Sequence, residues 1–363
     1  MRQRQVLAMS SSASNTRQKV VFLGTPDVAA KSLEMIVEAS KENPLSELYE
    51  VVAVVSNPPA PSGRKQKLTP SPVQKLAEKM NITVMVPEKA KDDEFLRKLE
   101  EIKPDLCITA AYGQWLPKRF LGIPRKGTLN VHPSLLPLFR GAAPVQRCLE
   151  RGDSVTGVSV AQTVLKMDAG PIVRQITHEL DGNEKADDLL MELFIKGTKE
   201  LLDVLPSYFD EENPIDMQEQ DDDAACPADK ISVEDARIDF SDRSNNAITI
   251  HNKCRGYAIW PGIWSNFQIG DNEEAQRVKI ITTRVLGAPG SSCLTDEVQV
   301  VKYQEIDGKG NKVGKQKDVL SVVCGDGSLL GVLELQPPGK KVMDAKSYIN
   351  GLRGQTLKWK PLE

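Results

Sequence analysis

The first two hundred residues alternate short apolar runs with amphipathic stretches of helical length, and this alternation constrains the fold most strongly. Helical patterns lie around Val73–Met80 and Glu94–Ile102, between runs that are too short and too β-branched for helices. The pattern predicts a parallel α/β sheet, since parallel strands need helical crossovers. The predicted strands are Val20–Leu23, Val51–Val55, Ile82–Val86, Leu106–Ala110 and Thr128–Val131.

The same domain is predicted to end in a hairpin and a helix. Gly157–Gln162 and Ile172–Ile176 read as the two strands, with Asp168 in the loop between them. Apolar residues from Leu189 to Val204 then recur with helical spacing. Gly24-Thr25-Pro26-Asp27 follows the first strand without the glycine spacing of a dinucleotide site, so a nicotinamide dehydrogenase is a remote alternative.

A change of pattern marks a second domain. The stretch from Tyr208 to Asp229 is acidic and turn-rich and reads as a linker. Beyond a short helix at Ala247–Cys254, about five short strands separated by turns predict a small β-barrel. We therefore divide the chain into a disordered or transit segment at 1–18, a catalytic domain at 19–206, an acidic linker at 207–229 and a barrel domain at 230–363.

Composition limits the class of protein. The chain has 363 residues, 40% of them hydrophobic, and a formal net charge of -3, which suits two domains with separate cores. Its apolar runs have strand length, so we expect no membrane span. Six scattered cysteines without a C-x-x-C pair favour a reducing compartment and neither disulfides nor zinc, and three distant histidines suggest no other metal. Without an obvious interface signal, we expect a monomer.

Three polar residues fall where an α/β sheet places its ligands. Asn130 and His132 lie near the carboxyl end of the fifth predicted strand, and Asp168 lies in the hairpin loop. An amide can stabilise an oxyanion, an imidazole can move a proton, and a carboxylate can orient the imidazole. Each residue alone has a simpler interpretation: Asn130 as a turn residue, His132 as a structural histidine, Asp168 as an Asx-turn residue. Together they predict acyl transfer.

The chain resembles the folate-dependent formyltransferases, and more narrowly the group that acts on methionyl-tRNA. The pattern Asn130-Val131-His132-Pro133-Ser134-Leu135-Leu136-Pro137 with the later Asp168 carries the chemistry, and Arg140-Gly141-Ala142-Ala143-Pro144 is the narrower signal. Further matching segments, in order along nearly the whole chain, are Val20–Asp27, Ser62–Arg64, Lys67–Val73, Ala111–Pro117, Ala236–Phe240 and Leu335–Lys341.

The resemblance implies a fold and an activity. It implies a Rossmann-like parallel-sheet formyltransferase domain followed by an OB-like barrel that binds tRNA. The implied reaction moves a formyl group from 10-formyltetrahydrofolate, as co-substrate, to the amine of methionyl-initiator tRNA for translation initiation. Asn130, His132 and Asp168 are the implied catalytic residues. Alternatives are transfer to another amine, such as an amino-sugar nucleotide, and a non-catalytic nucleic-acid-binding relative.

The resemblance also suggests binding residues. Folate contacts are expected at Tyr112, Gly113, Leu116, Ser134, Leu135, Leu136 and Pro137. Contacts with tRNA are expected at Arg64 and Lys67, in the loop that meets the acceptor stem in this family, and at Lys340 and Lys341, where cations cluster. A solvated surface is the alternative interpretation of Arg64 and of the lysine cluster. The loop Asn57–Lys67 departs from the family pattern, since Pro58-Pro59 stands where an acidic residue commonly follows the first proline. Trp260–Trp264 reads either as a base-stacking platform or as barrel core, and the core interpretation is favoured.

The N-terminal segment suggests a destination. Before Val20 the chain carries arginines and serines but no acidic residue, which fits an organellar transit segment or an ordinary disordered terminus. We expect a mitochondrial protein, with plastid and cytosol as alternatives.

Overall fold

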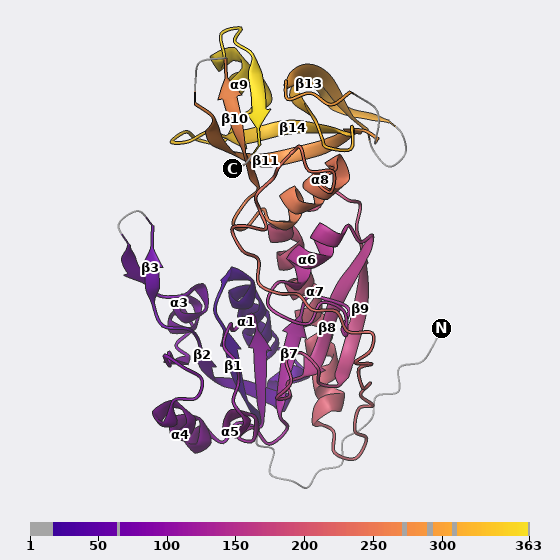
Figure 1. Ribbon diagram of the computed structural model, residues 1–363. Coiled ribbons are helices and arrows are strands. Elements are labelled where there is room, and N and C mark those ends of the chain that lie inside the picture. The colour runs from indigo at the N-terminus through magenta and orange to yellow at the C-terminus, as the bar shows by residue number, and fades with distance from the viewer. Residues whose placement is uncertain (1–16, 64–65, 271–273, 289–292, 307–310, 362–363) are drawn as a thin grey trace.

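Two β-sheets form the centres of two domains in this computed structural model (Figure 1). The structure describes residues 17–361 except 64–65, 271–273, 289–292 and 307–310. Arg64 therefore lies outside the described residues, and so does the proposed transit segment except for Arg17 and Gln18.

The N-terminal sheet has seven strands in the order β5-β2-β1-β6-β7-β8-β9. The strands from β5 to β7 pair in parallel, whereas β7 with β8 and β8 with β9 pair antiparallel. The predicted parallel sheet and terminal hairpin are both confirmed. The strands are β1 (Gln18–Gly24), β2 (Tyr49–Val55), β5 (Thr83–Met85), β6 (Leu106–Ala110), β7 (Thr128–His132), β8 (Val155–Gln162) and β9 (Ile172–Glu179).

Helices cover both faces of this sheet because its central strands are apolar on both sides. Val20 and Phe22 of β1 pack with α1 (Asp27–Ala39), α3 (Pro72–Lys79) and α7 (Ala186–Phe209). The alternate residues Val21 and Leu23 pack on the other face with Phe95, Leu99 and Phe120, which belong to α4 (Asp93–Ile102) and α5 (Lys118–Leu121). Two further elements lie beside this core: α2 (Leu45–Leu48) and the exposed hairpin of β3 (Ala60–Ser62) and β4 (Lys67–Thr69).

The C-terminal sheet is antiparallel and nearly closed. Its order is β12-β13-β14-β11-β10-β16, with β15 added beside β14. The chain just before β12 returns to β16, where Val298 donates to the carbonyl of Leu357 and Trp359 to that of Asp296. The strands are β10 (Trp264–Ile269), β11 (Gln276–Gly287), β12 (Gln299–Ile306), β13 (Lys312–Val323), β14 (Leu329–Gln336), β15 (Met343–Asp344) and β16 (Leu357–Lys360).

This barrel domain confirms the predicted short strands and helix and adds elements that the sequence analysis did not identify. The predicted helix is α8 (Ala247–Gly256), and the unpredicted elements are β15, β16 and α9 (Ala345–Gly351). Strands of two and four residues carry too few alternating positions to be recognised from periodicity. A single apolar cluster, which includes Phe240, Ile263 and Trp359, fills the barrel domain.

The domains meet through α6 (Pro144–Arg151) and α8, which lie side by side (Figure 1). Arg147 of α6 forms an ion pair with Asp235, 3.1 Å apart. A β-carbon on Gly256 would lie 2.9 Å from the carbonyl oxygen of Gln146, so this glycine permits the close approach of the two helices.

The segment predicted as a linker is bound to the N-terminal domain along part of its length. Helix α7 continues through Pro206 to Phe209, three residues beyond the predicted boundary. Gln218 then pairs with Ile172 at the start of β9, with backbone hydrogen bonds of 2.8 and 2.9 Å. The acidic composition therefore describes a surface segment rather than a free tether.

Candidate active site

A cavity of about 690 Å³ lies at the carboxyl ends of β6 and β7. Asn130, His132 and Asp168 all line it. Apolar side chains supply much of the remaining wall, among them Leu116, Met167, Met191, Phe194 and Ile259. Because Ile259 follows α8, the barrel domain contributes directly to this cavity.

Asn130 is oriented by a neighbouring strand. The hydroxyl of Thr109 in β6 donates to Asn130 Oδ1 over 2.8 Å. The amide oxygen is therefore engaged, and Nδ2 is the group left to donate into the cavity. The parallel register sets this contact, since Thr109 and Asn130 are partners across β6 and β7.

His132 is buried and is held by a hydrogen bond at one of its two nitrogens. Its Nε2 lies 2.9 Å from the carbonyl oxygen of Phe139, so Nε2 carries a proton and donates. Its Nδ1 lies 3.7 Å from Asp168 Oδ2. Because Nε2 is occupied, Nδ1 is the nitrogen that can exchange a proton, and it faces the Asp168 carboxylate.

Asp168 stands in a strained turn and reaches across to another loop. Its φ angle is +49°, in the left-handed region. The carboxylate accepts from the backbone N–H of Gly141 over 2.9 Å, rather than from its own turn. The Asx-turn interpretation of Asp168 therefore does not describe this side chain.

The expected folate contacts divide into two groups. Tyr112, Gly113 and Leu116 line the cavity. The hydroxyl of Tyr112 is buried without a hydrogen-bond partner, and burial raises its pKa, so it stays neutral.

Ser134, Leu135, Leu136 and Pro137 are not among the residues that line this cavity, and their expected folate contacts stay a prediction. Two polar groups of this segment form hydrogen bonds within the protein. The Ser134 hydroxyl donates to the carbonyl of Leu138, and Leu136 donates its N–H to Ser159 Oγ. The segment is irregular, as its prolines predict, and these two hydrogen bonds hold it within the domain.

The candidate tRNA contacts that the structure describes are exposed. Lys67 lies on β4 of the projecting hairpin, and Lys340 and Lys341 lie between β14 and β15.

Near the cavity, the side chain of Trp260 is half exposed, whereas Trp264 packs against the barrel core beneath Arg277. The core interpretation thus holds for Trp264 and not for Trp260.

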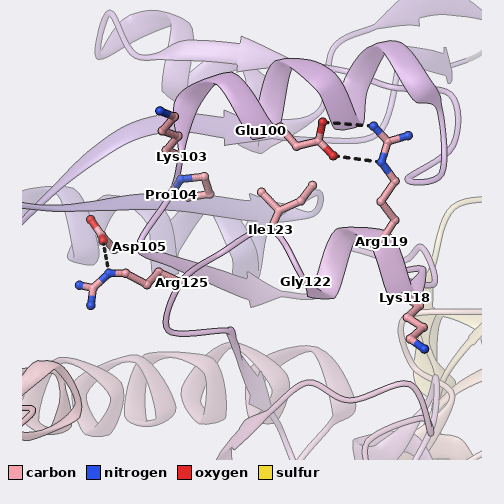
Figure 2. Close-up of a pocket in the computed structure, with 9 residues that line it drawn as sticks. All are labelled: Glu100, Lys103, Pro104, Asp105, Lys118, Arg119, Gly122, Ile123 and Arg125. Carbon is pink, nitrogen blue, oxygen red and sulfur yellow. Dashed lines mark hydrogen bonds and ion pairs between the residues drawn. The ribbon is translucent and has the colours of Figure 1, made fainter.

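A second hollow, of about 780 Å³, lies between α4 and α5 and lacks the chemistry of the first (Figure 2). Arg119 pairs with Glu100 and Arg125 with Asp105. These arginines are neutralised by carboxylates, and no histidine or asparagine lines the hollow. The candidate acyl-transfer residues therefore gather only in the first of these two cavities.

Two features are absent from the part of the chain that the structure describes. There, no group of three histidine, cysteine, aspartate or glutamate side chains is arranged to hold a metal ion. None of the helices found there is long and apolar enough to cross a membrane.

Two family models match the chain in order. The model described as formyl transferase matches residues 18–205, and the model described as formyl transferase, C-terminal domain, matches residues 230–353. Proteins named methionyl-tRNA formyltransferase are similar over nearly the whole chain. That of Macrococcus caseolyticus is 34% identical, covering 93% of this chain and 97% of its own. That of Saccharopolyspora erythraea is 35% identical, covering 94% and 100%.

Solved structures share the fold. An N-formyltransferase from Helicobacter canadensis, in complex with folinic acid and dTDP-3-aminofucose, has a TM-score of 0.58 at 17% identity, covering 89% of this chain and 100% of its own. HypX from Aquifex aeolicus, in complex with tetrahydrofolic acid, has a TM-score of 0.55 at 15% identity, covering 94% and 48%.

Proposed function

We propose that this chain, which belongs to the formyl transferase family, moves a formyl group from 10-formyltetrahydrofolate to the amine of methionyl-initiator tRNA. Formyl transfer itself follows from the family. The observation that carries the proposal is the meeting of Asn130, His132 and Asp168 in one cavity, in a chain similar to methionyl-tRNA formyltransferases over nearly its whole length.

The reaction needs an oxyanion site and a route for one proton. The acceptor nitrogen forms a bond to the formyl carbon, whose oxygen becomes negatively charged. Asn130 Nδ2 is free to donate to that oxygen because Thr109 occupies Oδ1. When the bond to the donor nitrogen breaks, the departing nitrogen gains a proton and the acceptor amine has lost one. His132 Nδ1 and Asp168, 3.7 Å apart, are placed to carry it.

The cavity suits a folate donor. Its volume of about 690 Å³ lies in the usual range for a small-molecule site, and its walls are mainly apolar. We assign the donor contacts to the wall that contains Tyr112, Gly113 and Leu116.

The acceptor is assigned from the relatives and from the two-domain architecture. Ile259 brings the barrel domain to the cavity wall, beside the apolar residues Met167 and Met191. Such a wall suits the thioether side chain of a methionyl group. The exposed Lys67, Lys340 and Lys341 suit a phosphate backbone.

Purified protein should be incubated with 10-formyltetrahydrofolate and three acceptors: methionyl-initiator tRNA, methionyl-elongator tRNA and an amino-sugar nucleotide. We expect rapid formylation of the initiator alone. Transfer to the sugar nucleotide would show that the proposed acceptor is wrong and that formyl transfer is correct. Folate binding without transfer to any acceptor would instead indicate a non-catalytic relative.

We also propose an organellar location, with the mitochondrion first. The support is compositional: residues 1–19 contain arginine, lysine and serine but no aspartate or glutamate. Fusion of residues 1–19 to a fluorescent protein should direct it to the organelle, whereas diffuse cytosolic fluorescence would contradict the proposal.

A further inference from the structure

We infer that the segment between the domains is part of the catalytic apparatus, and that Gln220 is a positioning residue for Asp168. The segment 220–228, called the strap here, binds both loops that complete the cavity. One is the loop 138–143 after β7, and the other is the Asp168 loop between β8 and β9. This inference rests on the proposed formyl transfer.

Gln220 joins the two loops with a single side chain. Its Nε2 donates to the carbonyl oxygens of Asp168, over 2.9 Å, and Gly170, over 2.7 Å. Its Oε1 accepts from Nε and Nη2 of Arg140, over 3.0 and 2.8 Å. Both donor hydrogens of the amide are thus used, and the oxygen accepts twice.

The strap backbone continues this attachment along the first loop. Arg140 donates its N–H to the carbonyl of Cys226, and Ala228 donates to the carbonyl of Arg140 over 2.7 Å. Ala143 donates in turn to the carbonyl of Ala228. A β-carbon on Gly141 would lie 2.6 Å from that same carbonyl oxygen, so the strap lies directly against the loop.

A second set of contacts between the strap and the two loops lies at the surface. Asp222 accepts from Nη1 of Arg140 over 2.7 Å and pairs with Lys166, which precedes Asp168 in its loop. The arginine itself is largely buried, with 10% of its side chain exposed. The strap therefore connects the two loops at two points.

The residues held in this way bear directly on the proton route. Phe139, whose carbonyl fixes the His132 tautomer, has a φ of +58°, and Asp168 has a φ of +49°. Phe139 donates its N–H to Cys226 Sγ of the strap. Non-glycine residues in this conformation persist only where their surroundings hold them. Gln220 stabilises the backbone conformation of Asp168, and the strap stabilises that of Phe139, which contacts His132.

The test compares Gln220→Leu with Gln218→Leu in the full chain. Gln218 is exposed and lies two residues upstream, outside the strap, so it makes a matched control. We expect Gln220→Leu to lower kcat at least tenfold while KM for the formyl-folate stays within twofold, because Tyr112, Gly113 and Leu116 come from another loop. Gln218→Leu should behave as wild type.

A double-variant cycle separates positioning from a general structural role. If Gln220 acts through Asp168, Gln220→Leu should cause little further loss in an Asp168→Asn background. Multiplicative losses, or a Gln220→Leu enzyme as active as Gln218→Leu, would overturn the inference. Inactive wild-type protein would instead count against the proposed function.

Gln220→Glu provides a second variant that keeps the Arg140 contact but removes both donations to the carbonyls of Asp168 and Gly170. We expect a loss of kcat similar to that of Gln220→Leu. If the leucine variant fails to fold, this variant decides, and full activity in it would contradict the inference. Thermal unfolding and folate binding, measured on every variant, establish that the folded protein is compared.

Discussion

Each candidate catalytic residue has a specific neighbour that fixes what it can do. Thr109 fixes which end of the Asn130 amide is free, Phe139 fixes the His132 tautomer, and Gly141 holds the Asp168 carboxylate. The three residue types predicted acyl transfer, but no sequence pattern predicted these hydrogen-bond partners. Two of them, Thr109 and Phe139, lie in segments that read only as strand and loop.

At the residue scale, Asp168→Asn tests the proton route. We expect kcat to fall by about a hundredfold or more, the usual contribution of a positioned acid or base. The variant keeps the size of the side chain, so folate binding and thermal unfolding should change little. Asp216→Asn, an exposed carboxylate beyond α7, is the control. Near-normal turnover in Asp168→Asn would show that the carboxylate does not carry the proton.

Thr109→Val tests the orientation of Asn130. The substitution removes the hydroxyl and keeps the volume, so Asn130 loses the donor that holds Oδ1. A hydrogen bond of this kind contributes about 0.5–1.5 kcal/mol, which predicts a two- to tenfold fall in kcat. Thr109→Ser should restore turnover because it keeps the hydroxyl. Equal rates in the valine and serine variants would contradict this role.

At the element scale, helix α7 fixes the position of the strand that carries Asn130 and His132. Gly197 of α7 faces β7 and β8 so closely that a β-carbon there would lie 2.6 Å from Val131 and 2.4 Å from Val158. Val131 stands between Asn130 and His132 in the chain. The packing of α7 against the sheet therefore sets the position of Val131 and, with it, the positions of Asn130 and His132.

Gly197→Ala should destabilise the protein and lower kcat. Overpacking costs about 1–3 kcal/mol, more than the roughly 1 kcal/mol that alanine gains over glycine in a helix. We expect the thermal midpoint to fall by a few degrees. Gly351→Ala, in α9 with open space around the added β-carbon, is the control and should be neutral or stabilising. Unchanged stability and turnover in Gly197→Ala would contradict tight packing here.

The helices and strands of the first domain were largely predictable, since periodicity and length identify elements such as α4 and β6. The hairpin of β3 and β4 was not identified, because its three-residue strands are exposed and follow two prolines. The strap was interpreted as a linker because its composition is acidic. Its role depends on pairing with residues about 50 to 90 positions earlier, which no local pattern reports.

At the scale of the whole molecule, His251 joins the two domains. From α8 it contacts Thr283 of the barrel through Nδ1, 2.9 Å away, and the carbonyl of Gly182 in the N-terminal domain through Nε2, 3.1 Å away. Burial, together with the nearby Arg284 and Arg255, lowers its pKa below the usual value near 6.5. It is therefore neutral in the folded protein at neutral pH.

This direction predicts a loss of stability in acid. The unfolded chain binds a proton at His251 more readily than the folded chain does. The contribution of His251 to the free energy of unfolding is therefore complete above about pH 6.5 and is lost as pH falls through the lower folded pKa. His251→Gln should cost about 1–3 kcal/mol at pH 7.5 and flatten the dependence of the thermal midpoint on pH below 6.5. Parallel curves for wild type and variant would contradict this assignment.

The sequence by itself determined the main strands of both sheets, the two-domain division and the three residue types of the candidate acyl-transfer site, because apolar periodicity and side-chain chemistry are local properties. Tertiary structure decided which groups meet. Ser134 and Leu136 form hydrogen bonds within the protein, Ile259 comes to the cavity from the barrel, and Gln220 binds the Asp168 loop. These contacts join segments far apart in the chain, and their distances follow from the packing of whole elements rather than from any pattern along the sequence.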